Sequence, residues 1–419
     1  MKNFKNLVAS ATAVAVAAGS LLTASTAIAG PEGGNMNTPG ELVIGYGAGG
    51  DGFFEARDST APYGTTFFGR TGYGAYNSSG PGQTFPILCN LDNDADAELV
   101  LGFGDIGQSG GVLGGFIEIR DIRSANHVSV SFLRANVPGT TFQANNGETR
   151  PACGDIDDDG RDEIVVGLGS GSLGFVQVFD DAVAGFAPMG GTPFPGGFLR
   201  FPQPGAYNST NGETFVAVGN LDGDSAEEIA IGGGNGAEGL VALIDDAGAS
   251  FAALSGTPIG GGFVRLKLPG GYNAANGTVH PAICDLDGVG NGELVLGVGV
   301  GGGGFAEVKD ASASFGPASG TAFPDGFTRI LFPGTYRSTN GTTKPFCGDL
   351  DGDGRDELGL GTGDSDTGVD GGDGFVELKG DLTNESVGGS DFVRANSGSF
   401  RATGNGATGT IVEVVPPPS

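Results

Sequence analysis

Five nine-residue segments of this chain share a pattern of acidic and amide residues. Position 1 holds Asp or Asn, position 3 Asp, position 9 Glu, and position 5 Asp in four of the five. Calcium takes six to eight oxygen ligands in a flexible arrangement. A segment with side-chain oxygens at these positions and a backbone carbonyl at position 7 can wrap one ion, and Gly at position 6 permits the sharp bend. The segments begin at Asn90, Asp155, Asn220, Asp285 and Asp349.

The five segments match this pattern to different degrees. The segments at 155 and 349 match fully, and those at 90 and 220 keep the side-chain ligands but lack the Gly. Val289 occupies position 5 of the segment at 285, so we expect weak or no binding there. The sequence therefore predicts about four calcium sites. Their expected ligands, with position 7 acting through its carbonyl, are Asp155, Asp157, Asp159, Arg161 and Glu163; Asp349, Asp351, Asp353, Arg355 and Glu357; Asn90, Asp92, Asp94, Asp96 and Glu98; and Asn220, Asp222, Asp224, Ala226 and Glu228.

Two other interpretations of these segments are weaker. An EF-hand needs a twelve-residue loop with a helix on either side, whereas a strand pattern follows each segment at once. Asp and Asn also form turns without any metal. Turn formation alone does not require acidic residues at fixed offsets in four of five copies.

The segments lie in a repeat that must position them. Their starts are separated by 65, 65, 65 and 64 residues. Each unit contains four short runs of alternating polarity bounded by turn residues, which favours strands. In one unit these are 281–284 before the acidic segment, 293–297 after it, 305–310 and 327–332. Repeated four-stranded antiparallel units are typical of a β-propeller.

The two ends of the chain complete one another. Segments 41–45 and 53–58 resemble the second and third strands of a unit that lacks its first strand, and 392–394 resembles a last strand. The apolar run 410–415 is placed to supply the missing strand. We therefore predict an all-β fold, a six-bladed β-propeller of four-stranded blades, closed by pairing of the C-terminal strand with the N-terminal blade.

The loops and the runs after them resemble FG-GAP or VCBS repeats, the units of the integrin α-subunit propeller and of many bacterial surface proteins. The resemblance covers about residues 41–415 and is most specific in the acidic loops. It implies calcium bound at positions 1, 3, 5 and 9 where these are present. Integrin propellers have seven blades, so six would be a departure from that relative.

The N-terminal 29 residues have the pattern of a signal peptide. Lys2 and Lys5 precede an apolar stretch that ends in Ala27-Ile28-Ala29, a small-x-small cleavage site. We expect residues 1–29 as signal peptide, 30–40 as a short linker, 41–415 as the propeller and 416–419 as a tail. The mature protein would be exported: secreted, on the cell surface or periplasmic. No later segment is apolar enough to span a bilayer.

The charge of the chain limits its partners. Without Lys2 and Lys5 it has 18 basic residues against 49 acidic ones, a net charge of −31. Such a surface repels nucleic acid and anionic membranes. We expect a monomer whose partner is an extracellular protein or a glycan.

Two further sets of residues recur in register. Arg70, Arg134, Arg200, Arg265, Arg329 and Arg394 occupy one position of the last strand. They either form a ring that captures an anionic ligand or pair with the Asp that ends the third strand, at 58, 121, 180, 245 and 310. The second interpretation is favoured, since repeat-wide residues usually serve the repeat. The four cysteines lie in first strands and either form two disulfides, Cys89 with Cys153 and Cys284 with Cys347, or remain buried thiols.

No catalytic triad or paired acid–base set stands out beyond the acidic loops, and His127 and His280 stand alone. We therefore expect a non-catalytic binding or adhesion module. A lectin-like glycan-binding propeller is the alternative, and an extracellular hydrolase or lyase is a third, because a fold does not determine a function.

Overall fold

The apolar runs after the acidic loops form the second strand of each blade, and they are buried on both faces. In the computed structural model all residues of these strands are buried where their side chains are described. Continuous burial fits their Val, Ile and Leu content, because each sheet packs between two neighbours. The structure describes residues 42–57, 65–79, 82–92, 97–106, 114–121, 129–203, 205–331, 335–351, 353–363, 374–382, 392–394 and 407–411.

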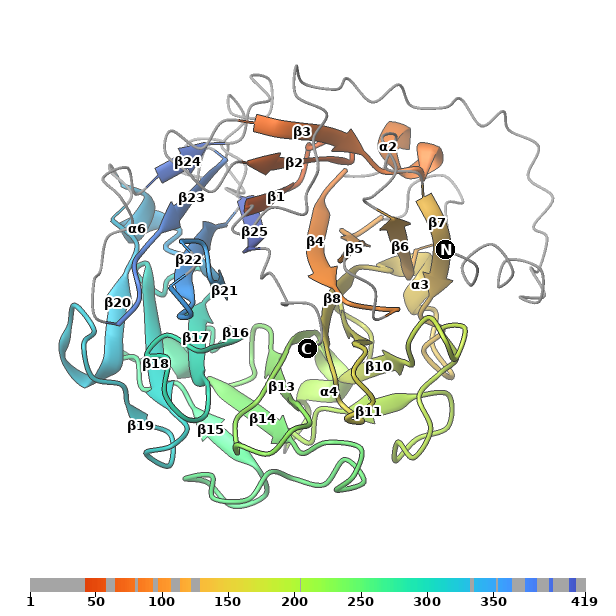
Figure 1. Ribbon diagram of the computed structural model, residues 1–419. Coiled ribbons are helices and arrows are strands. Elements are labelled where there is room, and N and C mark those ends of the chain that lie inside the picture. The colour runs from red at the N-terminus through yellow and green to blue at the C-terminus, as the bar shows by residue number, and fades with distance from the viewer. Residues whose placement is uncertain are drawn as a thin grey trace.

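Six antiparallel blades surround a central axis, so the predicted six-bladed propeller is confirmed (Figure 1). In each blade, strands a to d follow one another outward from the axis. The strands of the first three blades are β25 (Ala407–Ile411), β1 (Leu42–Tyr46), β2 (Phe53–Arg57) and β3 (Thr65–Arg70); β4 (Thr84–Cys89), β5 (Glu98–Phe103), β6 (Phe116–Asp121) and β7 (Ser129–Arg134); and β8 (Thr149–Gly154), β9 (Glu163–Leu168), β10 (Phe175–Phe179) and β11 (Phe198–Arg200).

The last three blades repeat this order. Blade 5 has one additional strand of two residues, β19 (Gly316–Pro317), and a short 3-10 turn, η1 (Pro324–Gly326). The four main strands of each blade are β12 (Thr214–Gly219), β13 (Glu228–Gly233), β14 (Leu240–Ile244) and β15 (Phe263–Arg265); β16 (Val279–Cys284), β17 (Glu293–Val298), β18 (Phe305–Asp310) and β20 (Phe327–Arg329); and β21 (Thr343–Gly348), β22 (Glu357–Thr362), β23 (Phe375–Leu378) and β24 (Phe392–Arg394).

The C-terminal strand closes the propeller, as predicted. β25 pairs antiparallel with β1, from Leu42 opposite Ile411 to Tyr46 opposite Ala407. The strand begins three residues before the apolar run 410–415 that predicted it. The length of strand b sets where β25 begins, because the last residue of strand b faces the first residue of strand a, as Phe103 faces Thr84 in blade 2. Residues 412–415 lie outside the described part of the chain, as do 1–40 and 416–419.

Short helices, which the sequence pattern did not predict, connect one blade to the next. In four of them a Tyr hydroxyl, at Tyr76, Tyr207, Tyr272 and Tyr336, joins two strands of the following blade: it accepts the N–H of the residue after strand b and donates to the carbonyl before strand a. Four to six residues are too few for an amphipathic stripe, so no periodicity reveals them. The helices are α2 (Gly74–Ser79), α3 (Phe142–Asn145), α4 (Tyr207–Thr210), α5 (Tyr272–Ala275) and α6 (Tyr336–Thr339).

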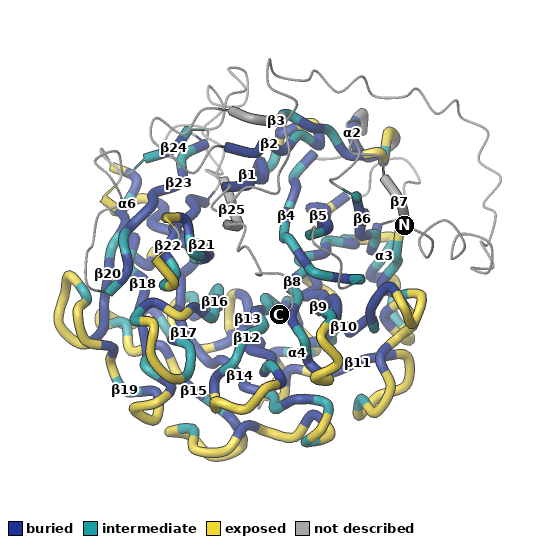
Figure 2. The backbone as a smooth tube through the Cα atoms, in the orientation of Figure 1, coloured by how far each residue is buried: buried dark blue, intermediate teal, exposed yellow. Residues whose placement is uncertain are grey.

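The core lies between the blades rather than within any one of them. Apolar clusters combine residues of adjacent sheets, such as Val100 and Ile119 of blade 2 with Ile164 and Val166 of blade 3. Exposed residues concentrate in the turns and outer loops (Figure 2). No helix in the described part of the chain is long and apolar enough to cross a membrane.

Candidate metal centre

The loop between β8 and β9 in blade 3 shows how the acidic segments fold. The Asp155 carboxylate accepts the N–H groups of Asp159 at 3.1 Å and Gly160 at 2.9 Å. Gly160 has a φ of +87°, so the predicted glycine at position 6 is needed for the bend. Glu163 Oε2 accepts the Ile156 N–H at 2.8 Å. Positions 1 and 9 therefore stabilise the turn as well as carrying charge.

Three of the predicted ligands of this loop converge. Carboxylate oxygens of Asp155, Asp157 and Glu163 lie within 4.8 Å of one another. Asp159 instead pairs with the side chain of Arg161, which also pairs with Asp181. The guanidinium of Arg161 thus neutralises part of the predicted ligand set.

Blade 4 gathers acidic groups without an arginine. Ala226 stands where blade 3 has Arg161. Within 4.8 Å, Glu228 groups with Asp222 and Asp245, and also with Asp224 and Asp246. This loop also bends at a glycine, since Gly223 at position 4 has a φ of +88°. Asn220 accepts the N–H of Gly223 at 2.7 Å and therefore acts in the turn.

The loops of blades 6 and 2 show the same framework where they are described. Asp349 accepts the Asp353 and Gly354 N–H groups at 3.2 and 2.9 Å, and Arg355 pairs with Asp353 at 2.6 Å. Asp351 accepts the N–H of Asp353 at 3.1 Å, and Glu357 accepts that of Leu350 at 2.6 Å.

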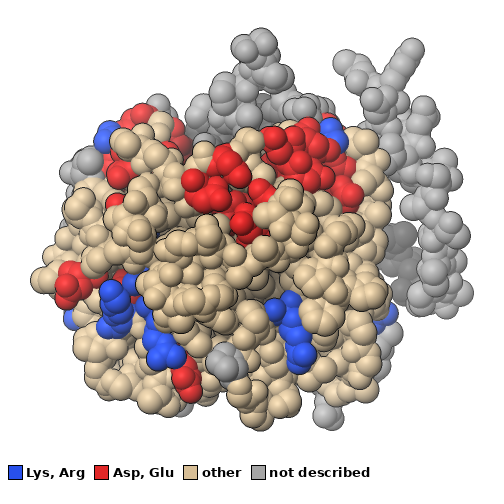
Figure 3. All heavy atoms as spheres, turned by 90° about the horizontal axis from the view of Figure 1, so that it is seen from below, with Lys and Arg blue, Asp and Glu red and all other residues tan. Residues whose placement is uncertain are grey.

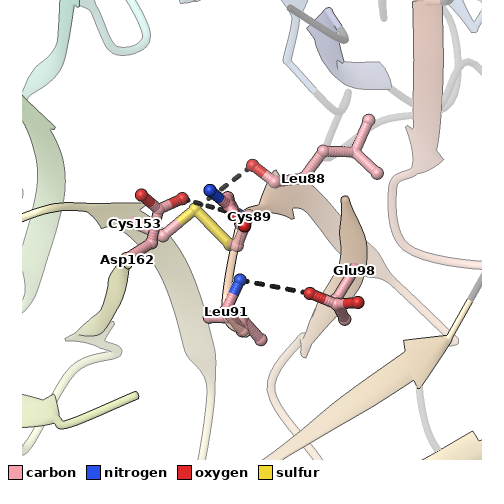
Figure 4. Close-up of a disulfide and its surroundings, with 7 residues drawn as sticks. Leu88, Cys89, Leu91, Glu98, Cys153 and Asp162 are labelled. Carbon is pink, nitrogen blue, oxygen red and sulfur yellow. Dashed lines mark hydrogen bonds between the residues drawn. A yellow bond between two sulfur atoms is a disulfide. The ribbon is translucent and has the colours of Figure 1, made fainter. Parts of the chain in front are cut away.

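In blade 2, Leu91 donates to Glu98 at 3.1 Å (Figure 4). Asn90 and Asp92 belong to the same loop. The predicted ligands Asp94 and Asp96 lie outside the described residues.

A second acidic segment follows strand c; the sequence interpretation assigned its first Asp to the strand-d arginines and did not place it beside the acidic loop. The β-sheet register places the last residue of strand c opposite the Glu at position 9, as Asp121 faces Glu98 and Asp310 faces Glu293. The corresponding pairs are Asp180 with Asp181 in blade 3 and Asp245 with Asp246 in blade 4. The Asp-Asp pair that recurs after strand c in blades 3 and 4 was the sequence signal that could have revealed this second acidic segment.

The environment of the Glu at position 9 favours a cation. Burial, together with the charges of Asp157, Asp155 and Asp180, raises the pKa of Glu163 to about 9. Burial and three neighbouring aspartates raise the pKa of Glu228 to about 8. Glu163 Oε1 and Glu228 Oε1 are buried and receive no hydrogen bond from any described residue. A buried carboxylate oxygen beside other carboxylates fits the oxygen-rich donor set of calcium.

The predicted pairing of the strand-d arginines with the aspartates after strand c is wrong for the arginines in the described blades. The register instead places each Arg opposite the first residue of strand c, at the far end from those aspartates, as Arg200 faces Phe175. Arg70, Arg134, Arg200, Arg329 and Arg394 lie over Phe53, Phe116, Phe175, Phe305 and Phe375, with 4.5 to 5.3 Å from guanidinium carbon to ring centroid. Arg265 faces Leu240 and pairs with Glu238 at 3.5 Å.

The arginines also do not converge on one ligand. Strand d is the outermost strand, so these side chains are distributed around the circumference. In the side view of Figure 3, acidic residues gather along one rim and most visible Lys and Arg lie toward the other. The acidic loops and the strand-d arginines therefore lie toward opposite rims of the propeller.

Two disulfides connect neighbouring blades near the acidic face. Cys89 joins Cys153, and Cys284 joins Cys347, each with Cα atoms 5.9 Å apart. Asp162 lies beside the first, where its carboxylate accepts the Asn90 N–H at 2.7 Å (Figure 4). Of the two possibilities that the sequence left open for the cysteines, the structure therefore has the disulfides.

No family model matches this sequence, and no curated protein matches it. Among solved structures, a rhamnogalacturonan lyase of Bacillus licheniformis is similar over 73% of this chain and 50% of its own, with 15% identity and a TM-score of 0.35. The rhamnogalacturonan lyase YesW is similar over 71% and 49%, with 15% identity and a TM-score of 0.32.

A lectin of Agrocybe aegerita that recognises non-reducing terminal N-acetylglucosamine is similar over 90% of this chain and 96% of its own. Its identity is 13% and its TM-score 0.40. The present chain spans about half the length of the two lyases. Likenesses at these values do not support any argument about activity or ligand.

Proposed function

We propose that this protein is an exported, calcium-binding β-propeller of the FG-GAP or VCBS type that acts as a non-catalytic binding or adhesion module. The observation that carries the calcium part is the buried, hydrogen-bond-free Oε1 of Glu163 and of Glu228, each within a group of carboxylates. In blade 3, Asp155, Asp157 and Glu163 would hold the ion. In blade 4, Glu228 with Asp222 and Asp245 would do so.

Bound calcium would act on stability rather than on a reaction. It supplies positive charge among carboxylates that otherwise repel one another, and it links the a–b loop to the acidic residues after strand c. Extracellular calcium modules bind at about 10⁻⁴ to 10⁻³ M. At about 1 mM calcium this corresponds to roughly 0.4 to 1.4 kcal/mol per site.

Export is supported by the signal-peptide pattern together with the two disulfides. Disulfides form and persist in oxidising compartments outside the cytosol. Both bonds connect blades that are adjacent in space, with sequence separations of 64 and 63 residues. They therefore constrain the unfolded chain over long loops.

A thermal unfolding experiment tests the calcium part. The mature protein, with its disulfides intact, is melted with 1 mM calcium, with 1 mM magnesium and with chelator. About four sites predict a rise of several degrees in melting temperature with calcium over chelator, and a smaller rise with magnesium, which demands a stricter geometry. Equal melting temperatures in calcium and chelator would remove the calcium proposal.

The binding role has its own tests. Binding on a glycan array that is lost with chelator would identify a carbohydrate as the ligand and make the protein a lectin. Turnover of a polysaccharide or a phosphate ester would overturn the non-catalytic part of the proposal.

A further inference from the structure

The innermost strands of the blades enclose a central channel. Strands β4, β8, β12, β16 and β21 lie innermost around the axis (Figure 1). Their residues line a cavity of about 820 Å³. This volume lies within the range of small-molecule sites, which are typically lined by apolar and aromatic groups with a few placed polar groups. None of the acidic-loop ligands proposed for blades 3 and 4 lines this channel.

One level of the channel carries a set of residues that we call the channel belt. Each is the second residue of its strand a, so the repeat places all of them at the same height. Strand a otherwise presents small or apolar residues to the channel. The channel belt comprises Phe85, Arg150, Phe215, His280 and Lys344.

On one side of the channel belt the cationic residue, Arg150, is already paired. The Arg150 guanidinium bonds to Glu148 at 2.8 Å and to Glu213 at 2.5 Å. Its carbon also lies 4.1 Å from the centroid of the Phe215 ring. Arg150 therefore acts as part of the wall.

On the other side of the channel belt the cationic residue, Lys344, has no such partners. The acids beside Arg150 lie two residues before the belt in blades 3 and 4, and the equivalent residues in blades 5 and 6 are Thr278 and Thr342. Lys344 lines the cavity, and its ammonium makes no ion pair or hydrogen bond with any described residue. A partly buried ammonium without an acid favours an external anion.

His280 lies next to Lys344, and Phe215 lies beyond it, so the belt offers a neutral polar ring and then an apolar one. His280 packs edge to face on Phe215, with ring centroids 4.2 Å apart. Burial, and then the charges of Lys344 and Arg150, lower the pKa of His280 well below 6.5. At neutral pH its imidazole is uncharged and can both donate and accept a hydrogen bond.

The charge along the channel also gives an anion a preferred end. Asp162, Glu227, Asp285 and Asp356 line the end next to the acidic loops. They repel an anion there, whereas Lys344 lies toward the opposite face of the propeller. At the opposite end Glu148 also lines the cavity, but it is paired with Arg150. An anion entering there therefore meets Lys344 without passing the four acids next to the loops.

We propose that the channel belt binds a small ring-bearing carboxylate, with the carboxylate on Lys344 and the ring against Phe215 and His280. This deepens, and rests on, the proposed role as a binding module. The shared chemistry is one carboxylate and one flat apolar face, which an acidic sugar and an aromatic acid both supply.

Isothermal titration calorimetry tests this site. The mature, disulfide-intact protein is titrated at neutral pH and fixed calcium with glucuronate, with benzoate and with glucose. We expect binding of at least one carboxylate and none of glucose, with affinity falling as salt rises. Glucuronate alone indicates a sugar acid, benzoate alone an aromatic acid, and both together any flat ring-bearing carboxylate.

Lys344→Gln should reduce the affinity by about tenfold or more, because it removes the charged half of the contact. The matched control is Lys267→Gln, which removes an exposed lysine on the outer strand β15 side of blade 4 and should leave the affinity unchanged. Melting temperatures of both variants report that they fold. Phe215→Leu should weaken binding independently of charge.

Absence of binding by both carboxylates, or equal affinity in wild type and Lys344→Gln, would overturn the proposal. The calcium melting shift, measured on the same preparation, keeps the two proposals separate. A retained shift without carboxylate binding removes only the channel site. Carboxylate binding without a shift removes only the calcium sites.

Discussion

The acidic loops of blades 3 and 5 have the same framework but different charge. In both, the Glu at position 9 accepts the N–H of position 2 at 2.8 Å, from Ile156 to Glu163 and from Leu286 to Glu293. In both, the Asp at position 1 accepts N–H groups of the turn. Gly160 and Gly290 both have positive φ. The loop therefore folds in the same way in the two blades.

The difference lies in the other acids. Position 5 is Asp159 in blade 3 and Val289 in blade 5, where the side chain is 71% exposed. After strand c, blade 3 has Asp181 and blade 5 has Ala311. Because blade 5 builds the turn without these carboxylates, turn formation does not explain them in blade 3. In blade 3 both pair with Arg161, which blade 5 replaces with Asn291, so the two loops differ by an arginine together with its two carboxylates.

The largest expected effect tests the shared framework. Glu163→Ala and Glu293→Ala should each destabilise the protein by about 2 to 4 kcal/mol in chelator, because each leaves a buried backbone N–H without its acceptor and a cavity in place of the side chain. Denaturant midpoints at a fixed chelator concentration measure this. A large effect at Glu163 with none at Glu293 would contradict the equivalence of the two loops.

The next effect tests the difference in charge. Asp157→Ala should remove one site's share of the calcium-dependent stabilisation, roughly 0.4 to 1.4 kcal/mol. Asp287→Ala is the matched control, because it occupies position 3 of the blade 5 loop. It should leave the difference in stability between calcium and chelator unchanged. Equal losses in the two variants would place a working site in blade 5.

A gain of binding should be possible in blade 5. Val289→Asp restores the acid at position 5, and we expect it to increase the calcium-dependent stabilisation by at most about 1 kcal/mol, since Ala311 still lacks its carboxylate. Val289→Thr keeps the shape without charge and serves as the control. Stabilisation by Val289→Asp that is equal in calcium and in chelator would mean that the acid acts without an ion.

The smallest expected difference concerns pH. The folded-state pKa is about 9 for Glu163 and about 8 for Glu293, both above the ordinary value of 4.5. A raised carboxyl pKa gives stability that is present below pH 4.5 and lost as the pH rises toward these values. In chelator, melting temperature should therefore fall from pH 6 to pH 9. Glu163→Gln and Glu293→Gln should each flatten this fall slightly.

Calcium should oppose the pH effect in blade 3 more than in blade 5. An ion next to Glu163 favours its charged form and offsets the loss. A pH profile that is identical with calcium and with chelator would contradict an ion at this carboxylate.

The sequence alone determined the repeat, the blade count and the closure. These follow from local information: a period of about 65 residues, alternating strands, turn residues and complementary chain ends. The loop turn was also predictable, because Asp155, Gly160 and Glu163 act within nine residues of one another.

Only the tertiary structure decided which distant residues meet. Asp181 reaches the loop through the pairing of strands b and c, and Arg200 reaches Phe175 because the register places them opposite each other. Cys89 meets Cys153, and Lys344 lies beside His280, through the stacking of adjacent blades. Residues about 65 positions apart come together only when the sheets pack around the axis. Their spacing in the sequence shows that they share a level, but not which side chain pairs with which.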